Sequence, residues 1–177
     1  MDTQFKSGFV YGTGAALNVQ CGFIPSRVET INLTDGSPIN IGFPSIKTMA
    51  FTSGGTNEIK AGHKLIGATS GATATVVAVL ADTGTWAGGD AAGTLILDAG
   101  SETGTFTSES VYYEGSSGTN DATGAATANQ GVDVDTEVAS DTGISAYLGS
   151  SAANSEGFTL ASAVSTDAKL IAWSAWR

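Results

Sequence analysis

The chain has 177 residues, of which 41% are hydrophobic and only 14% are charged, and it contains 24 glycines. A disordered chain would be poorer in apolar residues, so this composition predicts a folded, turn-rich protein of one or two compact units. Seventeen acidic against seven basic residues give a formal net charge of −10, which repels phosphate backbones and argues against nucleic-acid binding.

Short apolar runs with period-two alternation recur along the chain, whereas no stretch keeps the apolar spacing of an amphipathic helix for three turns. The segment 137–155 is the least strand-like, and we expect a long loop with a short helical turn there. Ten strands are predicted at residues 9–12, 16–23, 27–33, 47–52, 64–69, 72–81, 93–99, 109–114, 158–162 and 169–176. Their spacing favours an all-β, antiparallel sandwich or barrel over a parallel α/β sheet.

The middle section, residues 58–118, consists of strands joined by connections of a few residues, as antiparallel hairpins permit. Polar, glycine-rich stretches flank it, and such stretches are typical of domain boundaries. We predict an outer antiparallel β-sandwich made of residues 1–57 and 119–177, with a small acidic β-barrel-like domain, 58–118, inserted. The acidic residues are concentrated in the middle of the chain, which should face water while the neutral ends pack.

The stretch "TWAGGDAAGTLIL", residues 85–97, raises the possibility of a phosphate-binding loop. A Walker A loop needs a lysine and a Ser or Thr after its last glycine, and a dinucleotide-binding loop needs a helix there. A strand sequence follows Gly93 instead, and Asp90 would repel phosphate. We therefore predict a hairpin turn in which Gly88 and Gly89 adopt positive φ angles and Asp90 hydrogen-bonds to the turn backbone.

Candidate catalytic residues are sparse. The single cysteine, Cys21, rules out an intrachain disulfide and is expected to be a buried, inert thiol. The single histidine, His63, is expected to be a solvated residue at a turn, and no Ser-His-Asp arrangement or nucleophile elbow accompanies it. The start "MDTQFKSGFVYG" has no apolar signal segment, and no stretch approaches the roughly 18 apolar residues of a membrane span. We predict no enzyme, no cofactor and no membrane partner, in a protein made in a cytoplasm.

Three alternating carboxylates, Asp133, Asp135 and Glu137, would project from one face of a strand. Such a face could hold a calcium ion or supply a pair of glycosidase carboxylates. The glycine turn and the further oxygens of a calcium loop are missing, as is an aromatic-lined cleft that would raise a carboxyl pKa. A strand with one solvated face is therefore the preferred interpretation, with cation binding left as an alternative.

Aromatic residues supply the candidate interface positions. Trp173 and Trp176 are three residues apart, so on a strand one should fill the core and the other should face a neighbour, and Trp176 is our interface candidate of the two. Trp86, at a hairpin end, either caps the small barrel or anchors an interface. In the N-terminal arm "MDTQFKS", Phe5 is expected to anchor a contact with a neighbour and Lys6 to be its charge partner, with disorder of the arm as the alternative.

The stretches "GTGAALNVQCGFIPSRVETINLTDG" and "GFTLASAVSTDAKLIAWSAWR" resemble the ends of β-sandwich proteins in tailed-bacteriophage virions. In those proteins a "GF-x-P-x-x-V" strand opens the sheet and "GF-x-[IL]…W-x-A-x-R" closes the chain. The middle of the chain is similar to small β-modules of phage structural proteins. A more remote likeness is to H-type lectin domains, which also pair an early apolar strand with a late "GF…W-x-A" hairpin.

The resemblance implies a virion protein that decorates or cements the capsid surface, bound to the major capsid protein as a homo-oligomer, with a trimer expected. The acidic domain would project outward. The lectin likeness implies instead a tail or fibre module that binds host carbohydrate, for which Tyr112 and Tyr113 are the best candidate aromatics. A third alternative is a tail-tube or head-completion protein that assembles as a ring.

Overall fold

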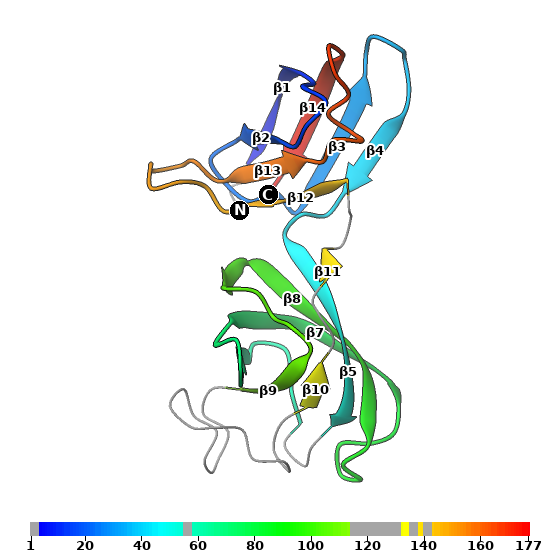
Figure 1. Ribbon diagram of the computed structural model, residues 1–177, viewed down its shortest axis with the longest axis vertical. Coiled ribbons are helices and arrows are strands. Elements are labelled where there is room, and N and C mark those ends of the chain that lie inside the picture. The colour runs from blue at the N-terminus through cyan, green and yellow to red at the C-terminus, as the bar shows by residue number, and fades with distance from the viewer. Residues whose placement is uncertain (1–3, 55–57, 114–131, 135–137, 140–142) are drawn as a thin grey trace. The chain divides into compact units, whose positions relative to one another are not determined.

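The computed structural model describes residues 4–54, 58–113, 132–134, 138–139 and 143–177. These residues form fourteen strands in antiparallel sheets and contain no helix, which confirms the predicted all-β class (Figure 1). The chain divides into two compact units. Unit 1 comprises Met1–Ile46 and Ala139–Arg177, and unit 2 comprises Lys47–Val138.

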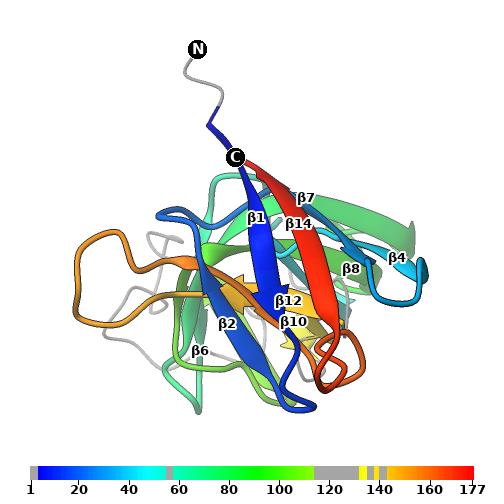
Figure 2. The ribbon, with the colours of Figure 1, turned by 90° about the horizontal axis from the view of Figure 1, so that it is seen from above.

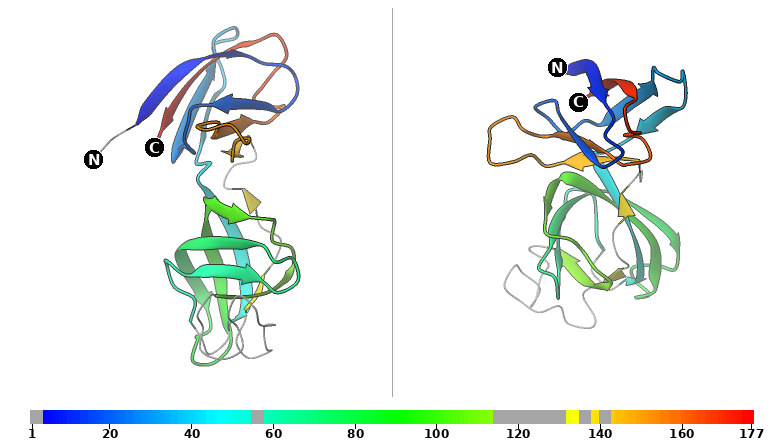
Figure 3. Two further views of the ribbon diagram at one scale, coloured as in Figure 1. Left: turned by 90° about the vertical axis from the view of Figure 1, so that its left-hand side faces the viewer. Right: turned by 45° about the horizontal axis from the view of Figure 1, so that its top comes forward.

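Unit 1 is built from a four-stranded and a three-stranded sheet, and the left view of Figure 3 shows their strands running in different directions. The four-stranded sheet has the order β1 (Phe5–Tyr11), β14 (Leu170–Trp176), β3 (Arg27–Asn32), β4 (Ile39–Gly42). The three-stranded sheet has the order β12 (Ile144–Tyr147), β13 (Gly157–Leu160), β2 (Leu17–Gln20). Figure 2 shows β1 and β14, from opposite ends of the chain, side by side.

Both sheets of unit 1 contribute side chains to one core, as expected for a β-sandwich. This core contains Val19, Cys21, Phe23, Val28, Ile144, Phe158, Leu160, Ile171 and Ala175. Period-two alternation decides which residues enter it, because Ile171, Trp173 and Ala175 point inward along β14 and their neighbours point outward. The Trp173 ring packs edge-on against Phe158, with ring centroids 5.5 Å apart.

Unit 2 is a rolled sheet whose pairings close on themselves. Its strands are β5 (Ile46–Gly54), β6 (Lys64–Gly67), β7 (Thr73–Thr83), β8 (Ala91–Thr103), β9 (Glu109–Tyr113), β10 (Val132–Val134) and β11 (Val138–Ala139). They pair in the order β10-β9-β6-β7-β8-β5-β11, and β10 also pairs with β5. Because β10 contacts both β9 and β5, six strands form a closed ring around a core that includes Phe51, Leu65, Leu95, Leu97 and Phe106.

The limits of the two units differ from the predicted domain limits, which were 57/58 and 118/119. The ring needs β5, which pairs with β8 and β10 and so brings residues from Lys47 onward into unit 2. The short helical turn expected within 137–155 is wrong for the described part of that segment. There the chain forms β12, in which Ile144 is buried opposite Leu160 of β13.

Candidate functional site: the outer face of the four-stranded sheet

Two of the four predicted interface residues lie together on the four-stranded sheet of unit 1. Phe5 of β1 is directly opposite Trp176 of β14, and their ring centroids are 5.3 Å apart at an angle of 51°. On the other side of Trp176, the guanidinium carbon of Arg27 lies 5.6 Å from the indole centroid, and Arg27 also forms an ion pair with Glu29. Phe5, Trp176 and Arg27 thus form a row across three strands at one end of the sheet.

The other two predicted interface residues lie elsewhere. Lys6 alternates with Phe5, so its side chain leaves the opposite side of β1. Trp86 belongs to unit 2, where it is partly buried and stacks on Phe51 with ring centroids 5.3 Å apart. This contact agrees with the core-capping alternative for Trp86. Phe5 and Lys6 both lie in β1, so the N-terminal arm belongs to a strand from Phe5 onward.

The side of the four-stranded sheet that points away from the unit 1 core is predominantly apolar, and we call it the outer face. Strand registers and alternation assign to it Phe5, Ser7, Phe9, Tyr11, Arg27, Glu29, Ile31, Ile39, Ile41, Leu170, Ala172, Ser174 and Trp176. Phe9 is 69% exposed, Tyr11 68% and Ile39 65%. An exposed apolar surface of this size is a candidate interaction site.

The strands at the two edges of the sheet carry most of this apolar surface. β1 presents its aromatic residues along one edge, and β4 presents Ile39 and Ile41 along the other. The charged side chains among the face residues named above are Arg27 and Glu29, and they pair with each other. The outer face is therefore apolar at both edges and nearly neutral at its centre.

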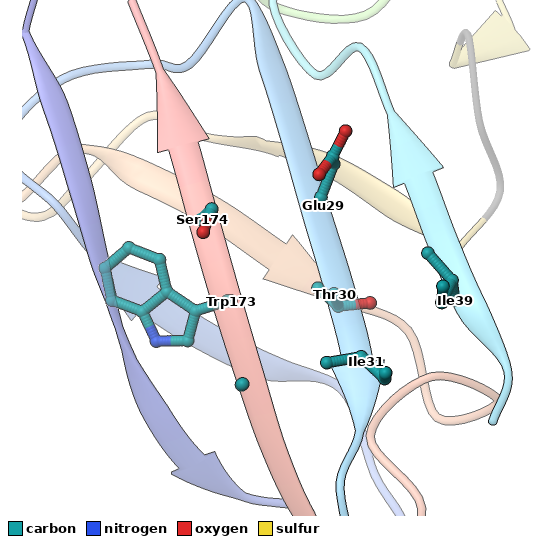
Figure 4. Close-up of a pocket in the computed structure, with 7 residues that line it drawn as sticks. Glu29, Thr30, Ile31, Ile39, Trp173 and Ser174 are labelled. Carbon is teal, nitrogen blue, oxygen red and sulfur yellow. The ribbon is translucent and has the colours of Figure 1, made fainter. Parts of the chain in front are cut away.

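A shallow hollow of about 180 Å³ lies over the middle of the sheet (Figure 4). It is lined by Glu29, Thr30, Ile31, Ile39, Ala172, Trp173 and Ser174, which come from β3, β4 and β14. The hollow exists because Ala172 and Ser174 are small, whereas Ile31 on β3 and Ile39 on β4 are large. Small-molecule sites usually measure about 300–1,000 Å³, so this hollow suits a single protruding side chain better than a cofactor or an oligosaccharide.

The residues weighed for catalysis are not assembled into a site. Cys21 is buried in unit 1, where its thiol donates to the Phe23 carbonyl at 3.1 Å and burial raises its pKa. His63 belongs to unit 2, where it follows a turn, as predicted, and is partly buried rather than fully solvated. Its ring stacks on Tyr113 at a centroid distance of 4.1 Å, and its Nδ1 accepts from the Lys60 backbone N–H at 3.2 Å. In the part of the chain that the structure describes, no three His, Cys, Asp or Glu side chains come together as a metal site.

The residues weighed for ligand binding are also placed differently from a binding site. Tyr112 is buried and Tyr113 packs against the unit 2 core, so this pair does not form an exposed platform for a sugar. Asp135 and Glu137 lie outside the described residues. The backbone of Asp133 lies opposite Thr52 of β5.

The glycine-rich stretch forms the turn of the β7–β8 hairpin. Gly89 has φ +74°, and Asp90 Oδ1 accepts from the Thr85 backbone N–H at 2.9 Å, both as predicted. The second positive φ belongs to Gly84, at +69°, and not to Gly88. Gly88 is constrained by space, because a Cβ there would lie 2.7 Å from Asp90 Oδ1. The Asp90 carboxylate thus already accepts from the Thr85 N–H, a backbone donor that a bound phosphate would need.

Sequence reasoning missed most of the outer face, although a signal was present. Phe5, Phe9 and Tyr11 alternate along one side of their strand, and Ile39 and Ile41 do the same. Their spacing alone would have assigned these side chains to one face each. The three-stranded sheet determines which of the two faces is covered, and the local sequence pattern does not show where that sheet packs.

Comparison with known proteins finds no family model, no curated protein and no solved structure that matches this chain significantly. No described helix is long and apolar enough to cross a membrane. The functional interpretation therefore rests on the geometry of the outer face and on the sequence resemblance.

Proposed function

We propose that this chain is a structural protein of a tailed-bacteriophage virion, which decorates or cements the capsid surface through contacts with other protein subunits. The observation that carries the proposal is the outer face of unit 1, an apolar surface whose central hollow is too small for a typical ligand. Proteins of an assembled lattice bind through many repeated surface contacts, which give avidity without a deep pocket.

The distribution of charge supports the same proposal. Unit 1 has four basic and six acidic residues, whereas unit 2 has three basic and eleven acidic residues. A nearly neutral unit with an apolar face can be buried against other subunits at little electrostatic cost. The acidic unit 2 stays hydrated and keeps the protein soluble before assembly.

The carbohydrate-binding alternative has less support. Sugar sites combine aromatic platforms with polar side chains that are free to bind hydroxyl groups. Tyr112 and Tyr113 do not form such a platform, and on the outer face Arg27 and Glu29 bind each other. No described feature specifically favours the ring-forming alternative over a capsid-surface protein.

The test is binding of the purified full chain to empty capsids that lack it, measured by co-sedimentation. We expect saturable binding at a stoichiometry set by the symmetry of the lattice, with the major capsid protein as the partner. Capsids of an unrelated phage are the control and should not bind. Binding to host cells or glycans without binding to capsids would contradict the proposal.

A further inference from the structure

We infer that the outer face of unit 1 binds the same face of a second copy of this chain, closing a two-fold dimer. The inference rests on the proposed function, because it names the first subunit that an assembly protein of this kind would contact. Three properties of the face lead to it: its exposed apolar area, its charge, and the position of the hollow relative to Phe9.

The exposed area is large enough for a stable contact. Phe5, Phe9 and Tyr11 are 53%, 69% and 68% exposed. An aromatic side chain offers roughly 200 Å², so these three expose about 380 Å² of largely apolar surface. Ile39 and Ile41, 65% and 46% exposed, add to it on the opposite edge. The total is comparable with the largest apolar patch of a typical monomer and approaches the roughly 800 Å² per partner of a standard interface.

Charge favours a second copy over a partner of opposite charge. The chain carries a net charge of −10, so a basic partner would be drawn to its acidic surfaces. The outer face offers such a partner only the Arg27–Glu29 pair, which is already neutralised. Two copies of this chain can approach only where repulsion is weak, and this face is such a place. When the outer faces of two copies come together, both sides of the contact are apolar, so their polarities match.

The shape of the face is also self-complementary. Phe9 projects from β1, and its cross-strand neighbour Ala172 forms the floor of the hollow. A knob and a hollow of about 180 Å³ therefore lie side by side on one surface. In a two-fold arrangement each Phe9 can enter the hollow of the other copy, so that one contact is made twice. The geometry points to a dimer, in contrast to the trimer that the virion resemblance suggests.

Sedimentation velocity of the full chain, over a range of concentrations, tests the inference. We expect a dimer that dissociates on dilution. Phe9→Lys and Ile39→Lys should each weaken self-association about 30-fold or more, because they place a charge in the centre of a desolvated contact. Leu148→Lys is the matched control. Leu148 is 51% exposed and lies in unit 1 outside the four-stranded sheet, so its substitution should leave the dimer intact.

The two lysine variants also separate face-to-face packing from pairing through the free edge of β1. Ile39 lies on β4, at the opposite edge of the sheet, so edge pairing of β1 would not require it. Circular dichroism and thermal melting establish that each variant is folded. The inference fails if the chain is monomeric up to about 0.1 mM, where even a weak interface of standard size would be occupied. It also fails if a trimer forms, or if both lysine variants still dimerise like the wild type.

The outcome is independent of capsid binding. A dimer that does not bind capsids would overturn the proposed function and leave the inference standing. A monomer that binds capsids would overturn the inference alone.

Discussion

Replacing Glu109 by glutamine should destabilise unit 2, because this carboxylate connects two of its loops. Glu109 begins β9, and its Oε2 accepts from the backbone N–H groups of Thr69 and Ser70 at 2.7 and 2.8 Å. Its Oε1 accepts from the Ser70 hydroxyl at 2.5 Å and from the Thr107 backbone N–H at 3.3 Å. One side chain thus holds the β6–β7 turn against the segment that precedes β9.

The size of the effect follows from counting donors and acceptors. Glutamine keeps the shape of glutamate but has a single acceptor oxygen, which can serve the two N–H groups of Thr69 and Ser70. The amide nitrogen of glutamine then takes the place of Oε1. It faces the Thr107 N–H, and because both groups are donors the hydrogen bond between them is lost. Hydrogen bonds to a charged group contribute about 1.5–3 kcal/mol and neutral ones about 0.5–1.5 kcal/mol, so we expect a loss of about 2 kcal/mol at this half-exposed site. For a unit of this size that lowers Tm by roughly 10 °C.

Differential scanning calorimetry of Glu109→Gln and Glu58→Gln is the assay. Glu58 is in the same unit and loses the same charge, but its side chain is 49% exposed and it bonds to Lys60 at 3.2 Å. Exposed pairs of this kind contribute about 0–1 kcal/mol, so Glu58→Gln should shift Tm far less. Equal shifts for the two variants would refute the role assigned to Glu109.

The effect of Glu109→Gln should depend on pH. Burial raises the pKa of the Glu109 carboxyl, but the hydrogen bonds from Ser70, Thr69 and Thr107 outweigh it and leave the pKa below its ordinary value of 4.5. A lowered pKa means that the ionised form stabilises the fold at pH values above 4.5, and that this stabilisation is lost as the pH falls through the folded-state value. The Tm difference between wild type and variant should therefore narrow at acidic pH. A difference that stays constant down to about pH 3 would argue against the mechanism.

Two further predictions concern the hairpin and the thiol. Gly93→Ala should destabilise unit 2 in chemical denaturation by several times the roughly 1 kcal/mol expected for Gly89→Ala. A Cβ at Gly93 would lie 2.0 Å from the Leu80 carbonyl oxygen, whereas a Cβ at Gly89 would lie at an ordinary contact distance of 3.8 Å from the Gly54 carbonyl oxygen. Similar costs for the two variants would show that the hairpin relaxes freely. Cys21 should react with a thiol reagent only after unfolding in urea. The residue is 2% exposed, its thiol donates a hydrogen bond to the Phe23 carbonyl, and burial raises its pKa. Rapid labelling of the native protein would contradict this placement.

Local sequence pattern was sufficient to predict most of the strands, because alternation and turn residues are properties of a few neighbouring positions. Each of the ten predicted strands overlaps a strand of the structure. The opposite orientations of Trp173 and Trp176 followed from their spacing alone. β4 and β12 were missed because each has only four residues, too short a run to stand out from the turn residues around it. Their backbone is recruited by β3 and β13, which is a tertiary effect.

The limits of unit 2 could not be read from composition. The ring closes through Thr52 of β5 opposite Asp133 of β10, residues 81 positions apart. The glycine-rich stretch "TSGGTN" looks like a linker, yet its first three residues continue β5. Long-range pairing of this kind depends on which strand edges are free, and a local pattern does not contain that information.

The candidate site shows the same division between local and tertiary information. Aromatic character was enough to select Phe5 and Trp176. Trp86 has the same character but is partly buried against Phe51, because the unit 2 core extends to its hairpin end. The exposure of a side chain depends on which other part of the fold covers its face of the sheet. The three-stranded sheet covers the opposite side of the four-stranded sheet, so Phe9 and Ile39 stay exposed, and local sequence does not contain that information.

An isolated monomer exposes the apolar side chains of the outer face to water, which is energetically unfavourable. Apolar side chains more than half exposed on the edge strand β1 invite non-specific association, which proteins usually avoid with charges along such an edge. Here most of the acidic charge is on unit 2, which carries eleven of the seventeen acidic residues, whereas the charged side chains of the outer face are the paired Arg27 and Glu29. The proposed dimer needs this distribution of charge, because its contact surface is apolar and most of the repulsive charge lies in other parts of the chain.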